Sequence, residues 1–279
     1  MSENEAASQG SDEQLDRVFG AVATLPYFAE HSELVVRKAI DRVLRGDSTG
    51  RYSIGELTPE EKKHIGTHVE QGLIREFFDD RRGERLDTTV EGVEVDIKNT
   101  VGETWMIPPE AVNKICLLSA IDETSQKYSI GLIRANESIL TKPNQDKKRS
   151  LSSRGRSMIR WIVRDRDLRV SVFARDTNVR LRVFSKKSGQ ARVAELFRQV
   201  EATPIQRSDI EVAAVHKGRQ VDVRARVRDA KIKLRSEGLL LLRGWNSKER
   251  DEARRRGRVI TKSECIVLKL SEKSAEQES

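Results

Sequence analysis

The chain has 279 residues, enough for two domains of ordinary size. With 37% hydrophobic and 34% charged residues, it is typical of a soluble globular protein, and no apolar run approaches the roughly 18 residues of a membrane span. The net charge of +8 and the pI of about 9.5 favour a polyanionic partner. Two cysteines without disulfide or zinc spacing, and no secretory leader, indicate a cytoplasmic protein that does not enter a membrane.

The first helices are indicated by apolar spacing. Residues 1–11 are small, polar and acidic, and we expect a disordered tail. From Ser11 the spacing predicts a helix that reaches Val22. A second helix is expected from a cap at Ser32 to Leu44, followed by a loop over 45–52.

A third helix begins with a capping box, in which Thr58 is the cap and Glu61 lies three residues later. Glu70 lies at the edge of its apolar stripe, where a carboxylate can face a cleft, although most such residues are surface carboxylates. His64 and His68 are four residues apart but lack both the adjacent Glu of a zincin and a third ligand, so we expect surface histidines and no zinc.

The segment from Asp87 to Lys98 combines a hairpin pattern with converging charges. Val93, Val95 and Ile97 alternate with polar residues after a Glu91-Gly92 turn, which predicts a strand with one buried face. Asp87 on the preceding strand can then lie beside Asp96 and Lys98. Two carboxylates and an ammonium make a site for a hard divalent cation such as Mg²⁺. The alternative is a solvated charge pair that contributes little.

Downstream, residues 114–121 and 127–134 predict a second hairpin, which would complete a mixed α/β sheet flanked by helices. Residues 142–166 then carry nine basic residues against Asp146 and Asp165, and we expect a loop that runs into a basic helix over 153–163. This density of charge favours contacts with phosphates over a merely solvated helix. The DNA-binding candidates here are Lys147, Lys148, Arg149, Arg154, Arg156 and Arg160.

The last third predicts helices over 191–200, 206–214 and 221–236, then strands over 239–242 and 266–270. This order is typical of a winged helix-turn-helix, whose third helix enters the major groove. The alternative is a small α+β dimerisation module. The candidates on the third helix are Arg224, Arg226, Arg228, Lys231 and Arg235. We therefore expect a catalytic domain at 12–166, a winged-helix domain at 167–271 and a disordered tail at 272–279.

Glu70, Asp87 and Val95-Asp96-Ile97-Lys98, followed by a basic segment and a winged-helix pattern, resemble the NaeI family of type II (type IIE) restriction endonucleases, within the PD-(D/E)xK superfamily. The resemblance implies that Glu70, Asp87 and Asp96 form the acidic metal cluster and that Lys98 is the catalytic lysine. Ile97 joins the three acids as an expected metal ligand. Leu86 stands where the superfamily prefers proline, and Asp96 replaces the commoner glutamate.

The resemblance further implies a homodimer that uses Mg²⁺ to cut double-stranded DNA at a short palindromic site, with a second DNA copy on the winged-helix domain as effector. Two alternatives stay open: a winged-helix regulator that binds DNA without cutting it, and a methylation-dependent or nicking repair nuclease. No phosphate-binding Gly-x-x-x-x-Gly-Lys-Ser/Thr loop is present, so we expect no use of ATP.

Overall fold

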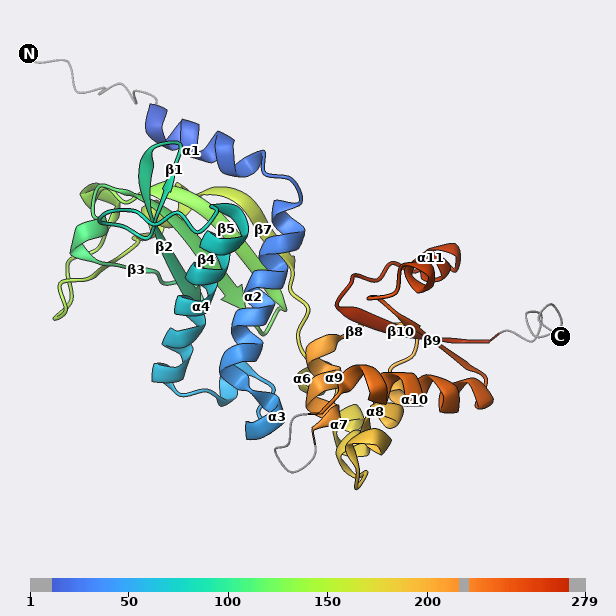
Figure 1. Ribbon diagram of the computed structural model, residues 1–279. Helices are drawn as coiled ribbons and strands as arrows, with labels where there is room; N and C mark the ends of the chain where they lie inside the picture. Colours follow the sequence, from blue (N-terminus) through green and yellow to red (C-terminus); the bar gives the residue numbers. More distant parts are fainter. Residues whose placement is uncertain (1–11, 216–220, 271–279) are drawn as a thin grey trace, which may run out of the picture. The chain divides into compact units, whose positions relative to one another are not determined.

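The computed structural model describes residues 12–215 and 221–270 (Figure 1). The tails expected at 1–11 and 272–279 lie outside these residues. The chain forms two compact units: unit 1 is Met1–Val43 and Leu57–Arg169, and unit 2 is Leu44–Glu56 and Val170–Ser279. Within the described ranges, no helix combines the length and apolarity needed to cross a membrane.

Unit 1 is built on a five-stranded mixed sheet in the order β1-β2-β4-β5-β7. Only β2 and β4 run parallel, and the other neighbouring pairs are antiparallel. Both predicted hairpins, β1–β2 and β4–β5, are confirmed. The strands are β1 (Thr88–Val90), β2 (Val93–Val101), β4 (Ile115–Asp122), β5 (Lys127–Arg134) and β7 (Arg160–Asp167), with a separate pair β3 (Met106–Ile107) and β6 (Arg149–Ser150).

The helices of unit 1 are α1 (Glu13–Ala23), α2 (Phe28–Leu44), α4 (Pro59–Phe77) and α5 (Ser153–Ser157), with short 3₁₀ turns at Pro109–Ala111 and Glu137–Ile139. The predicted capping box is present, since the Thr58 hydroxyl accepts from the Glu61 amide and the Thr58 amide donates to the Glu61 carboxylate at 2.9 Å. The predicted start of the second helix is wrong. The Ser32 hydroxyl is buried and lies 3.2 Å from the Tyr128 hydroxyl, inside a helix that begins at Phe28.

Helices α2 and α4 run alongside one another over the sheet (Figure 1). Gly72 on α4 permits this close approach, because a β-carbon there would stand 2.6 Å from Cγ1 of Val35 on α2. Without a side chain at Gly72, the backbones of the two helices can pack directly against each other.

The basic helix expected over 153–163 is wrong. Helix α5 ends at Ser157, and the chain enters β7, which pairs with β5 at the edge of the sheet. The run Trp161-Ile162-Val163 explains the difference, because aromatic and β-branched residues favour a strand over a helix. The basic residues of this segment are therefore divided between a loop, one helical turn and an edge strand.

Unit 2 combines several helices with a small antiparallel sheet in the order β8-β10-β9. The three helices predicted from the sequence are present, and the described part of unit 2 also contains α6, α7 and α11, which the sequence did not predict. The elements are α6 (Val172–Arg175), α7 (Thr177–Phe184), α8 (Gly189–Gln199), β8 (Ile205–Gln206), α9 (Arg207–Ala214), α10 (Val223–Ser236), β9 (Leu239–Arg243), α11 (Ser247–Arg255) and β10 (Glu264–Lys269).

A segment from the amino-terminal part of the chain also belongs to unit 2. It contains the short helix α3 (Gly46–Thr49), which falls in the expected loop over 45–52, and a 3₁₀ turn at Ile54–Glu56. Tyr52 packs in the unit 2 core, with its ring 5.4 Å from that of Phe173 and 5.8 Å from that of Phe184. The sequence places this segment in the first domain, so the division along the chain is more interleaved than expected.

Candidate active site

The β1–β2 hairpin brings together the two aspartates and the lysine that the sequence singles out. Its turn is Glu91-Gly92, where both residues have positive φ, 50° and 73°. The Lys98 ammonium donates to Oδ1 of Asp96 at 2.8 Å and to Oδ2 of Asp87 at 3.4 Å. One ammonium thus joins the two carboxylates.

Backbone contacts hold this arrangement in place. Asp87, which directly precedes β1, accepts a hydrogen bond from the Ile97 amide through Oδ2 at 2.7 Å. The Ile97 carbonyl accepts from the Lys98 ammonium at 3.2 Å. The predicted metal ligand Ile97 therefore contributes a backbone oxygen on the lysine side of the cluster, while its side chain is buried.

Asp96 is the most unusual group of the cluster. Only one face of β2 was expected to be buried, yet Asp96 on the other face is 3% exposed. Its Oδ2 is buried and, within residues 12–215 and 221–270, no group donates a hydrogen bond to it. Burial raises the pKa of Asp96 from 3.8 to about 6, although the Lys98 ammonium opposes this rise. A buried carboxylate oxygen without a donor is costly in an apoprotein and is suited to a cation.

Lys98 stays charged in this environment. Burial lowers its pKa, but the adjoining Asp96 and Asp87 carboxylates outweigh burial, and the net pKa is raised from 10.5. At neutral pH the side chain is therefore an ammonium, a hydrogen-bond donor that carries a positive charge.

Glu70 on α4 lies within the electrostatic field of the cluster. Its pKa is raised by burial and then by Asp87, against the effects of Lys98 and Arg82. The Arg82 guanidinium lies 3.5 Å from Oε1 of Glu70. Sequence reasoning missed Arg82, and only its place in the loop between α4 and β1 could have indicated it.

The predicted cluster of three acidic ligands is not assembled. Across residues 12–215 and 221–270, no group of three or more His, Cys, Asp and Glu side chains could together hold a metal ion. Asp87 and Asp96 share the lysine, whereas Glu70 makes its ion pair with Arg82.

The basic residues predicted to bind DNA in unit 1 have different surroundings. Lys147, Lys148 and Arg154 are exposed, and no ion pair of theirs occurs among the described residues. Arg149 lies 3.5 Å from Glu137, and Arg156 donates to the Leu151 carbonyl at 3.2 Å. Arg160 pairs with Asp16 at 2.5 Å and lies over the Phe19 ring, so it ties β7 to α1.

Helix α10 divides its basic residues between two faces. Arg224, Arg228 and Arg235 are exposed along one stripe that flanks the buried face, and Lys231 lies on the same stripe. Arg226 instead lies against α8, since a β-carbon at Gly189 would stand 2.2 Å from its Nη1. Lys231 is held at 2.8 Å by Glu249 of α11.

Two comparisons with known proteins identify the family. The family described as restriction endonuclease NaeI matches residues 29–278. The type II restriction enzyme NaeI of Lentzea aerocolonigenes is 34% identical over 244 residues, which cover 83% of this chain and 75% of that enzyme. The chain therefore belongs to the NaeI family of type II restriction endonucleases.

Proposed function

We propose that this chain hydrolyses phosphodiester bonds of double-stranded DNA at a short palindromic site, as a homodimer that uses Mg²⁺. Family membership supports site-specific cleavage of DNA. The observation that carries the proposed active site is the Lys98 ammonium between Asp87 and Asp96, at the end of a buried hairpin.

The residues present fit a hard divalent cation. Asp87, Asp96 and the Ile97 carbonyl offer oxygen donors only, and the partnerless Oδ2 of Asp96 is a buried acceptor. Glu70 is the fourth proposed donor, and it would have to exchange its ion pair with Arg82 for the cation. When bound, Mg²⁺ would lower the pKa of a water and neutralise the phosphate.

The chain's own contribution is charge and position. Because Lys98 is charged at neutral pH, we assign it to stabilising the negative charge that develops on the phosphate, in preference to acting as a base. The Ile97 amide donates to the Asp87 carboxylate and so fixes the position of this carboxylate in the site. Attack by water forms one P–O bond and breaks another, and the leaving oxygen takes up a proton.

The test compares Lys98→Ala with Lys114→Ala, an exposed lysine next to β4. Lys98→Ala should bind duplex DNA but lose cleavage by at least about a hundredfold, as expected when a charge stabiliser is removed. Lys114→Ala should cut DNA at the wild-type rate. EDTA should stop cleavage by the wild-type chain and by Lys114→Ala. Cleavage by Lys98→Ala at the wild-type rate would overturn the assignment, and sequencing of the cut ends would identify the site.

For unit 2 we propose a winged-helix domain with α10 as the recognition helix. The order α8, β8, α9, α10, β9, β10 and the antiparallel sheet β8-β10-β9 support it. We place Arg224, Arg228 and Arg235 at the DNA, which is the cleaved site or a second effector copy. Lys231 lies on the same stripe and is held by Glu249, and Arg226 supports the helix against α8.

This second proposal has its own measurement. Arg224→Ala/Arg228→Ala should weaken DNA binding and make its dependence on salt shallower, by about one unit of slope for each phosphate that the variant no longer neutralises. Lys262→Ala/Lys269→Ala, which removes two exposed charges of unit 2 outside α10, is the matched control. Equal salt dependence in the double variant and the control would refute the role of α10.

A further inference from the structure

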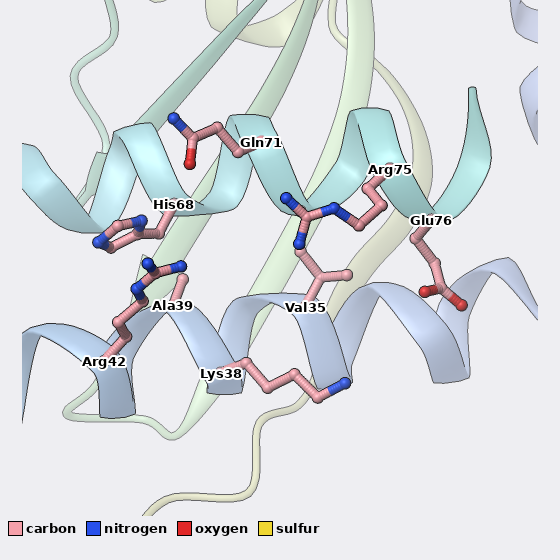
Figure 2. A pocket seen from close by; sticks show the side chains of 9 residues that line it. Val35, Lys38, Ala39, Arg42, His68, Gln71, Arg75 and Glu76 are labelled. Carbon is pink, nitrogen blue, oxygen red and sulfur yellow. The ribbon is translucent and has the colours of Figure 1, made fainter. Parts of the chain in front are cut away.

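A pocket of about 180 Å³ lies between α2 and α4, and its lining contains none of the residues proposed for the active site (Figure 2). Helix α2 lines it with Val35, Lys38, Ala39 and Arg42, and helix α4 lines it with His68, Gln71, Gly72, Arg75 and Glu76. Gly72 is the point of contact of the two helices, so the pocket is part of the packed framework of unit 1.

The pocket has an excess of positive charge. Lys38, Arg42 and Arg75 are exposed, and none of them has an ion pair among the residues that the structure describes. The single acid of the lining, Glu76, is engaged by His31 at 2.8 Å. Three cations therefore surround one hollow whose only carboxylate already has a partner, and an anion would balance their charge.

His68 adds an unfilled hydrogen-bonding position. Its Nδ1 is buried and has no hydrogen-bond partner among the residues that the structure describes. The Arg42 side chain lies beside the ring in the lining of the pocket (Figure 2). An oxygen anion would supply both an acceptor for the ring and a counter-charge for the arginine.

Size limits the ligand. Sites for drug-sized molecules are about 300 to 1,000 Å³, and this pocket is smaller. We propose that it binds one phosphate group, held by Arg42, Arg75 and Lys38 with His68 at its side. The phosphate is a backbone phosphate of DNA or a free phosphate ion. The first source rests on the proposed function, and the second does not.

The experiment compares the wild-type chain with Arg42→Ala/Arg75→Ala and with Lys62→Ala/Lys63→Ala. The control removes the same charge from the first turns of α4, outside the pocket. Equal melting temperatures first establish that all three proteins fold. In one arm, inorganic phosphate is titrated while the ring resonances of His68 are followed. In the other, duplex affinity is measured without metal from low to moderate salt.

Phosphate should move the His68 resonances in wild type and in the control, and not in Arg42→Ala/Arg75→Ala. If the pocket holds DNA, the same double variant should also show a salt dependence shallower by about 0.9, the slope that corresponds to one phosphate no longer neutralised. An effect in the phosphate arm alone assigns the site to free phosphate. Wild-type behaviour of the double variant in both arms overturns the proposal. Absence of DNA cleavage by wild type would refute the proposed function and leave the phosphate arm readable.

Discussion

Replacement of Asp96 by asparagine should stabilise the metal-free protein while it abolishes cleavage. Asp96 is 3% exposed, one of its oxygens has no hydrogen-bond partner in the described part of the chain, and its pKa is raised from 3.8 to about 6. This difference corresponds to about 3 kcal/mol of unfavourable free energy for the ionised form. Asparagine keeps the shape without the charge. Because Lys98 then retains only Asp87 as counter-ion, we expect a net gain of about 2 kcal/mol.

The sign of the pH dependence distinguishes this explanation from simple repacking. Since the folded pKa exceeds the unfolded one, the native state binds more protons between pH 3.8 and about 6, and wild-type stability falls as the pH rises through that window. The advantage of Asp96→Asn should therefore be small at about pH 4.5 and complete at about pH 8. The exposed Asp122 has a pKa lowered by Ser125, so Asp122→Asn should show no such gain.

The measurement is urea unfolding in EDTA, followed by tryptophan fluorescence. Trp105 and Trp161 lie in unit 1 and Trp245 lies in unit 2, so a Trp245→Phe background restricts the signal to unit 1. A loss of stability in Asp96→Asn at about pH 8, or an advantage that is the same at both pH values, would refute the electrostatic reasoning.

Three further outcomes concern packing and a second ion pair. Gly72→Ala should destabilise unit 1 by about 1 to 3 kcal/mol because of the clash with Val35, whereas Gly20→Ala on α1, with nothing within 4 Å, should stabilise it by up to about 1 kcal/mol in the same urea titration. Glu249→Gln should cost unit 2 about 3 kcal/mol, because Glu249 accepts from the Arg243 amide at 2.7 Å and pairs with its guanidinium. Burial raises the pKa of Glu249, but Arg243 and Lys231 outweigh burial, and the net pKa is lowered from 4.5. Wild-type stability should therefore be lost as the pH falls below 4.5. Glu249→Gln should lack this loss, and a variant with the wild-type pH dependence would contradict the explanation.

The features that the sequence predicts well are local. The capping box at Thr58 and the turn at Glu91-Gly92 depend on residues within three or four positions of one another, and both are present. The alternation along β2 likewise predicts that Asp96 and Lys98 share a side, and the Lys98 ammonium does reach Asp96.

The features that were missed depend on distant partners. Ser32 is a good cap by type, but Tyr128 captures its hydroxyl from a strand far along the chain. The burial of Asp96 follows from the neighbouring strand β4, where Cys116 lies in register beside it. Arg82 pairs with Glu70 from the loop between α4 and β1, and the path of this loop cannot be predicted from apolar spacing. Such contacts arise from tertiary packing, which overrides local preference.

The placement of Tyr52 has a consequence for how the protein can be divided. The polypeptide enters unit 2 at Leu44, returns to unit 1 at Leu57 and leaves it again after Arg169, so three covalent connections join the two bodies. A fragment that stops at Arg169 would carry Leu44–Glu56 without the aromatic neighbours of Tyr52, and a fragment that starts at Val170 would lack the ring that fills their core. To produce either unit separately, the segment Leu44–Glu56 must be transferred to unit 2 or deleted from unit 1. Proteolytic cleavage at one of the three connections leaves the two folded units joined through the other two.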